Sequence, residues 1–97
     1  MPLGTVKVID YSDDYRVVCR LDHDCLVELE VQGPHDWRRE VRTSWGDARW
    51  WRLKDLPKAL ETASKLIEER RVYVERFNDV TRDFEAIVEI HQIAATL

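Results

Sequence analysis

The C-terminal tract, residues 55–97, constrains the fold more than any other part of the chain. It contains no glycine, and no proline after Pro57. Written in a seven-residue repeat, three neighbouring rows of the tract hold 15 apolar residues in 18 positions. The rows are Ala59, Leu66, Tyr73, Val80, Ile87, Ala94; then Leu60, Ile67, Val74, Thr81, Val88, Ala95; and then Leu56, Ala63, Arg70, Phe77, Phe84, His91. This spacing is typical of a helix that buries one face, so the tract is predicted to be helical.

The length of the tract leaves three conformations open. A single helix would be roughly 60 Å long at ~1.5 Å per residue, whereas a compact domain of this size has a radius of gyration near ~13 Å. A continuous helix would therefore extend beyond its own domain and bind a partner. A break near Asn78-Asp79 would instead give two helices packed on the rest of the fold. The β-prone segments 72–74 and 84–88 also allow part of the tract to be strand.

The N-terminal half, residues 1–53, shows the alternation of antiparallel strands. Predicted strands cover residues 5–11, 15–21, 25–32 and 37–45, and a short fifth strand covers 49–53. Turn-forming residues separate them. In the third strand the side chains expected to face inward are Cys25, Val27, Leu29 and Val31. Polar residues alternate with them, which indicates a sheet covered on one side only.

The loop before the fourth strand sets its register. A three-residue loop would place Glu30 opposite Arg38, and a five-residue loop would place Glu28 opposite Arg42. Both registers pair opposite charges, so the choice between them stays open.

The predicted fold class is therefore α+β, in one domain of 97 residues. A four- to five-stranded antiparallel meander (residues 1–53) is followed by a long C-terminal helix, or by two helices broken near Asn78-Asp79 (residues 54–97). The helical part packs on one face of the sheet.

Composition narrows the function classes. The net charge of −4 provides no general attraction to nucleic acid. Residues 35–54 form a local basic segment between two acidic ones. No apolar run reaches ~18 residues, so no membrane span is expected. The N-terminus lacks the pattern of a signal peptide, which predicts a cytoplasmic protein.

All four tryptophans fall within the basic segment, interleaved with arginines. This mixture has three interpretations: a structural cluster, a protein-binding surface, or a surface that stacks on nucleic-acid bases and pairs with phosphates. The residues predicted to bind a partner are Trp37, Arg39, Arg42, Trp45, Arg49, Trp50, Trp51 and Arg52. Because Trp50 and Trp51 are adjacent, a strand would point them to opposite faces.

No catalytic, metal or cofactor motif is predicted. Cys19, His23, Cys25 and His35 are the residue types that bind zinc, but their spacing matches no standard zinc motif. No nucleophile elbow, Gly-rich phosphate loop or carboxylate pair is present. The chain is therefore predicted to be no enzyme and to hold no cofactor.

The last turns of the helical tract are apolar on nearly all sides, which predicts contact with another subunit. The expected assembly is a symmetric homodimer. The residues predicted to form the oligomer contact are Phe84, Ile87, Val88, Ile90, His91 and Ala94.

The preferred function is a small non-enzymatic protein-interaction module: an adaptor, inhibitor or assembly factor. In size and composition the chain resembles phage-encoded host-defence inhibitors such as anti-CRISPR proteins, and this resemblance implies a viral inhibitor that binds a protein target. The alternatives are a nucleic-acid-binding protein that uses the Trp/Arg segment, and a small-ligand-binding domain.

Overall fold

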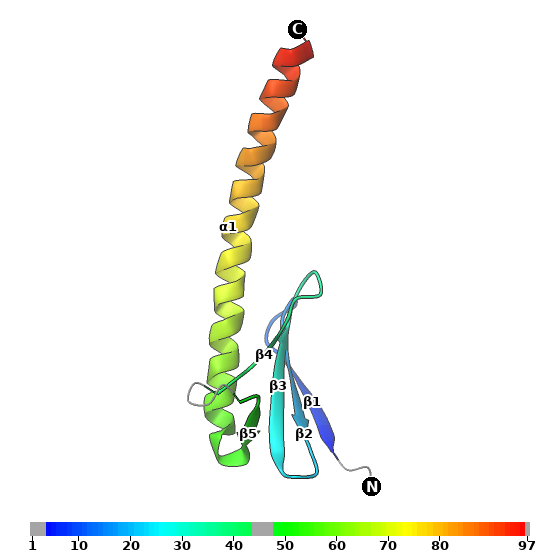
Figure 1. Ribbon diagram of the computed structural model, residues 1–97, viewed down its shortest axis with the longest axis vertical. Helices are drawn as coiled ribbons and strands as arrows, with labels where there is room; N and C mark the ends of the chain where they lie inside the picture. Colours follow the sequence, from blue (N-terminus) through cyan, green and yellow to red (C-terminus); the bar gives the residue numbers. More distant parts are fainter. Residues whose placement is uncertain (1–3, 44–47, 97) are drawn as a thin grey trace. The chain divides into compact units, whose positions relative to one another are not determined.

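A computed structural model describes residues 4–43 and 48–96 of the chain (Figure 1). The strands are β1 (Thr5–Asp10), β2 (Arg16–Leu21), β3 (Leu26–Gln32), β4 (Arg38–Glu40) and β5 (Trp50–Arg52). A short 3-10 helix, η1 (Leu53–Asp55), leads directly into the helix α1 (Leu56–Thr96). An antiparallel sheet followed by one long helix confirms the predicted α+β fold class.

The helix α1 is continuous over 41 residues and passes through Asn78 and Asp79 without a break. The two alternatives, a helical hairpin and a partly strand-forming tail, are therefore wrong. The local reason is that the tract past Pro57 has no helix-breaking residue and keeps one apolar phase throughout. Pro57 lies in the first turn, where its missing N–H removes no helical hydrogen bond.

Contacts within the chain group it into two compact units, Met1–Ile67 and Glu68–Leu97. The first unit contains the sheet, η1 and the first turns of α1. The second unit consists of the remainder of α1.

The sheet has the strand order β1-β2-β3-β4, and β5 pairs with β3 as well. The β3 strand carries both short strands in succession along its length. β5 pairs with residues 26–28, and β4 pairs with residues 30–32. The predicted strand over residues 37–45 is therefore shortened to Arg38–Glu40, although the N–H of Val41 still donates to the carbonyl of Leu29 at 3.0 Å. From Leu26 to Glu28, β3 pairs with β5 instead.

The five-residue loop sets the register of β4. The backbone N–H of Gly33 donates to the carbonyl of Trp37 at 2.9 Å, and His35 and Asp36 both have φ near 59°. In this register, Glu30 of β3 lies opposite Glu40 of β4. Neither predicted charge pair forms, since β4 ends before Arg42 and Trp50 of β5 occupies the place opposite Glu28.

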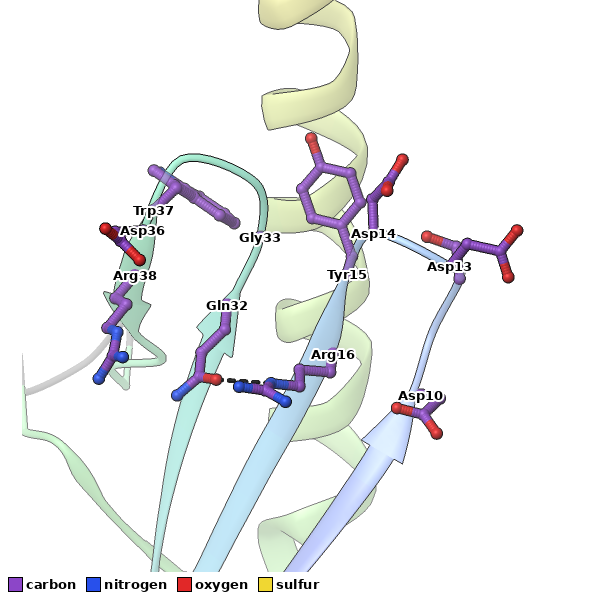
Figure 2. Close-up of a pocket in the computed structure, with 11 residues that line it drawn as sticks. Asp10, Asp13, Asp14, Tyr15, Arg16, Gln32, Gly33, Asp36, Trp37 and Arg38 are labelled. Carbon is purple, nitrogen blue, oxygen red and sulfur yellow. Dashed lines mark hydrogen bonds between the residues drawn. The ribbon is translucent and has the colours of Figure 1, made fainter.

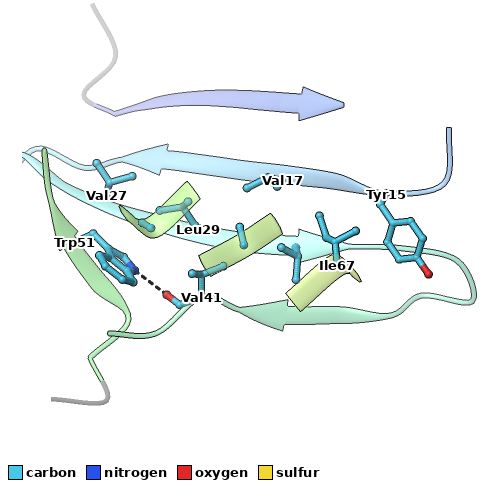
Figure 3. Packing of buried hydrophobic residues seen from close by; sticks show 10 residues of the cluster. Tyr15, Val17, Val27, Leu29, Val41, Trp51 and Ile67 are labelled. Carbon is cyan, nitrogen blue, oxygen red and sulfur yellow. Dashed lines mark hydrogen bonds between the residues drawn. The ribbon is translucent and has the colours of Figure 1, made fainter. Parts of the chain in front are cut away.

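The core lies between one face of the sheet and the first three turns of α1 (Figure 3). Alternate residues of β3 supply its centre, and Leu29 and Val31 have no exposed surface. The helix contributes Ala59, Ala63 and Ile67, all fully buried. The two alanines among these residues allow the helix backbone to approach the sheet closely, because their side chains occupy little space.

Candidate interaction surfaces

The structure separates the adjacent tryptophans of β5, as the alternation of a strand requires. Trp51 is 2% exposed and lies in the core, where its Nε1–H donates to the carbonyl oxygen of Val41 at 2.7 Å (Figure 3). Trp50 is half-buried, and the guanidinium of Arg49 lies 5.1 Å from its ring centre. Trp51 is thus a core residue and is not available to a partner, whereas Trp50 remains partly accessible.

The arginines near β5 gather around a carboxylate. Arg42 Nη2 lies 3.0 Å from Glu40 Oε2, and Arg49 Nη1 lies 3.7 Å from Glu40 Oε1. Arg39 and Arg52 are exposed. The positive charge of this segment is therefore partly neutralised within the sheet unit, which weakens the interpretation as a phosphate-binding surface.

The remaining predicted partner-binding residues do not join this group. Trp37 lies beyond the opposite end of β3, where its ring packs edge-on against Tyr15 at a centroid distance of 6.0 Å. Trp45 lies outside the described residues. The structure therefore splits the predicted Trp/Arg surface into two places at opposite ends of one strand.

Tyr15 and Trp37 border a polar hollow of about 230 Å³ at the loop end of the sheet (Figure 2). Arg16 and Gln32 line it, and Arg16 Nε donates to Gln32 Oε1 at 2.6 Å. Gln32 Nε2 in turn donates to Oε1 of Glu30, outside the hollow, at 2.6 Å. The acidic side chains that line it are Asp10, Asp13, Asp14 and Asp36. The first three are neighbours in the sequence, but nothing in the sequence connects them with Asp36, which the β3–β4 loop brings to the same end.

The four zinc-type residues do not assemble. Cys25, expected as an inward strand residue, is exposed and has φ of 64° in the turn before β3. This turn is held by Asp22, whose Oδ1 accepts hydrogen bonds from the N–H groups of Asp24 and Leu26. Over residues 4–43 and 48–96, no group of three or more His, Cys, Asp or Glu side chains is arranged to hold a metal ion.

The two free thiols differ in environment, which predicts selective modification. Burial raises the pKa of the Cys19 thiol, while Cys25 is exposed. Because the thiolate is the reacting form, iodoacetamide at pH 8 should alkylate Cys25 well before Cys19 in the folded protein. Peptide mass spectrometry over a time course measures this order, and denaturant should abolish the difference. Equal rates in the folded chain would contradict the placement of Cys19 against the core.

The longest exposed apolar surface lies on the second unit. Phe77, Phe84 and Ile87 expose 57%, 64% and 58% of their surface. All six residues predicted for the oligomer contact are exposed on this helix. We define the tail stripe as the part of the three apolar rows beyond Glu69: Arg70, Tyr73, Val74, Phe77, Val80, Thr81, Phe84, Ile87, Val88, His91, Ala94 and Ala95.

Side chains at the start of the tail stripe pack on one another along the helix. The rings of Tyr73 and Phe77 stack with centroids 6.2 Å apart. The guanidinium of Arg70 lies 5.0 Å from the ring centre of Tyr73, so the charge interrupting the apolar row rests on an aromatic neighbour. Further along, His91 Nδ1 lies 3.0 Å from the carbonyl oxygen of Ile87.

A second exposed surface, which the sequence did not indicate, is the edge strand β1. Every residue of β1 is exposed, and Val6 and Val8 expose 58% and 51% of their surface. In the described part of the chain β1 pairs with β2 only. Alternation by itself does not tell an edge strand from a central one.

Comparison with known proteins yields no relative: no family model matches the chain, and neither a curated protein nor a solved structure is similar to it. Within the described ranges, no helix combines the length and the apolar character needed to span a membrane.

Proposed function

We propose that this chain is a non-enzymatic protein-interaction module that binds a protein partner through the tail stripe, as an adaptor, inhibitor or assembly factor. The observation that supports this most is the exposure of large apolar side chains at helical spacing in the tail stripe from Tyr73 to Val88. Scattered exposed apolar residues are normal on a protein, but a contiguous band of them is typical of a binding surface.

The energetics of helices support the same proposal. In water, a helix gains most of its stability by packing an amphipathic face rather than from intrinsic propensity. The first turns of α1 bury their apolar rows against the sheet, through Ala59, Ala63 and Ile67. From residue 68 onward the same rows carry larger apolar side chains that stay exposed. A protein that covers them would stabilise this segment of the helix.

Surface area gives the proposal a scale. The chain exposes 7693 Å². A compact monomer of its mass, 11.5 kDa, exposes only about 5,800 Å² by the scaling of folded proteins. The excess of about 1,900 Å² on one chain is more than the ~800 Å² that each partner of a standard protein–protein interface buries.

Paired lysine substitutions test the tail stripe. The double variant Val80→Lys, Phe84→Lys places two charges in the stripe. The control Ala86→Lys, Ile93→Lys makes the same change in charge on the opposite face of the helix. The stripe variant should weaken binding of protein partners, whether a second copy or a protein captured from the cells of origin, by at least about 30-fold, the scale of an interface hot spot. The control should bind as the native chain does.

Binding of each partner is measured with equal concentrations of the native chain and the two variants, and circular dichroism checks that the helix is retained. If the stripe variant keeps every partner of the native chain, the proposed function is wrong. If the control loses the partners equally, the binding face is not the tail stripe.

A further inference from the structure

We infer that the partner of the tail stripe is the tail stripe of a second copy, and that the two helices run antiparallel about a midpoint near Arg82. This inference rests on the proposed function and names the partner of the same surface. It depends on the order of side-chain sizes along the helix, on the length of the exposed segment and on its area.

The tail stripe has two central rows whose sizes are complementary when one is reversed. One row runs Tyr73, Val80, Ile87, Ala94, and the other runs Arg70, Phe77, Phe84, His91. Taken as the d and a positions of a heptad, residues of one row face residues of the other when two helices pack antiparallel. Aligning the two tails end to end places Phe84 opposite Val80 of the second copy.

The same alignment sets the remaining layers. Phe77 faces Ile87 of the second copy, and Arg70 faces Ala94, the smallest residue of the row. Apart from Tyr73, each large side chain therefore meets a medium or small one, as dense packing requires. Tyr73 faces His91 in the layer between Arg70–Ala94 and Phe77–Ile87, where the surface has a shallow apolar hollow bordered by Ile87, Val88 and His91.

A parallel pair fits less well, because every residue would face its own copy. Arg70 would meet Arg70, which places like charges together at the edge of an apolar seam. Phe77 and Phe84 would each meet an identical ring, while Ala94 would meet Ala94 and leave space unfilled. Alternating overfilled and underfilled layers cost stability in a packed interface.

The part of α1 that the sheet already covers limits the register of the two helices. A shift of one heptad would bring Arg76 beside Asp83 of the second copy, an attractive pair. It would also slide residues 90–96 onto residues 61–67 of the second copy, where Ala63 and Ile67 are fully buried against their own sheet. The opposite shift leaves Arg70 and Tyr73 without a facing residue of the helix as described, Leu56–Thr96. Of these three registers, the end-to-end one pairs the most tail-stripe residues of α1 without overlapping the turns that the sheet covers.

The exposed area is also large enough for contact with a second copy. The excess of about 1,900 Å² on each copy is larger than the ~800 Å² that each partner of a standard interface buries. An isologous contact needs the same patch on both partners, and one tail stripe provides it.

Disulfide trapping tests the orientation. In the full chain with Cys19→Ala and Cys25→Ala, one preparation carries Tyr73→Cys and another carries His91→Cys. In the inferred dimer, the thiol introduced at position 73 faces the thiol introduced at position 91 of the other copy, while identical positions lie about 27 Å apart along the helix at ~1.5 Å per residue. Oxidation of the mixture should therefore cross-link the two variants, and oxidation of either alone should not.

The native chain is examined in parallel by sedimentation over a concentration series, with a dimer as the expected species.

Substitution of Asp83 gives a second measurement, because the inferred register places Asp83 beside Asp83 of the second copy. Asp83→Asn should tighten the dimer about two- to fivefold by removing this like-charge contact. In a parallel pair Asp83 would flank Val88, and the change would bring no such gain.

The outcomes separate the inference from the proposed function. Cross-linking of each single variant with itself, or a native chain that stays monomeric throughout, overturns the inference. In either case a lysine-sensitive interaction with another protein still supports the proposed function. If neither mass nor partner binding responds to lysine in the tail stripe, both are overturned.

Discussion

Replacing Trp51 with alanine is expected to lower the free energy of unfolding of the sheet unit by about 3–5 kcal/mol, the range for truncating a buried aromatic residue. The side chain is 2% exposed and packs in the core. Its removal would leave a cavity, and the carbonyl of Val41 would lose the indole N–H that donates to it. An unpaired buried carbonyl adds to the loss.

Trp50→Ala is the matched control, because it removes the same side chain from the adjacent residue. Trp50 is only half-buried and lies beside an exposed arginine, so a loss of about 1 kcal/mol is expected. Denaturant unfolding followed by tryptophan fluorescence measures both variants, since the tryptophans all lie within residues 37–51 and report on the sheet unit. Equal losses from the two variants would show that Trp51 is not the core residue.

Ile67→Ala should cost about 2–5 kcal/mol, because it removes a fully buried side chain from the last turn of α1 that covers the sheet. The lost stability comes from packing between the helix and the sheet, so unfolding followed by tryptophan fluorescence should detect it. Both this variant and its control are measured at one protein concentration, since association changes apparent stability.

Ile93→Ala makes the same substitution in the same helix, where the isoleucine is 55% exposed and lies outside the tail stripe. A change within about 0.5 kcal/mol is expected, as for most surface positions. If Ile93→Ala destabilised the chain as much as Ile67→Ala, the boundary between the covered and exposed parts of α1 would be misplaced.

Local sequence patterns were sufficient to predict most of the buried face of β3. Alternation predicted the inward set of β3, and Val27, Leu29 and Val31 are buried. Cys25 was placed in the same set, but the hairpin turn takes it into a left-handed conformation before the strand begins. Turn geometry overrides alternation at a strand end, because the tight turn fixes the backbone there.

The candidate site was less accessible to sequence reasoning. The Trp/Arg segment looked like one surface because its residues are close in the chain. The structure places Trp51 in the core, Trp37 beyond the other end of β3, and Arg42 beside Glu40. Proximity in sequence does not decide which face of a short strand is covered, since that depends on pairing with distant residues.

The sequence by itself predicted a helical tract with an apolar face past Pro57, because helical periodicity and the lack of breaking residues are local properties. It left open whether the tract breaks near Asn78-Asp79, and the structure shows one continuous helix. Only the tertiary structure decided where that face is covered. The apolar rows continue along the whole helix, yet Ala59, Ala63 and Ile67 are buried while Phe77 and Phe84 are exposed. The buried helix residues belong to the first compact unit, where they pack with the strands, and the exposed ones belong to the second. Which turns the sheet covers depends on tertiary packing, which the periodicity of the helix does not contain.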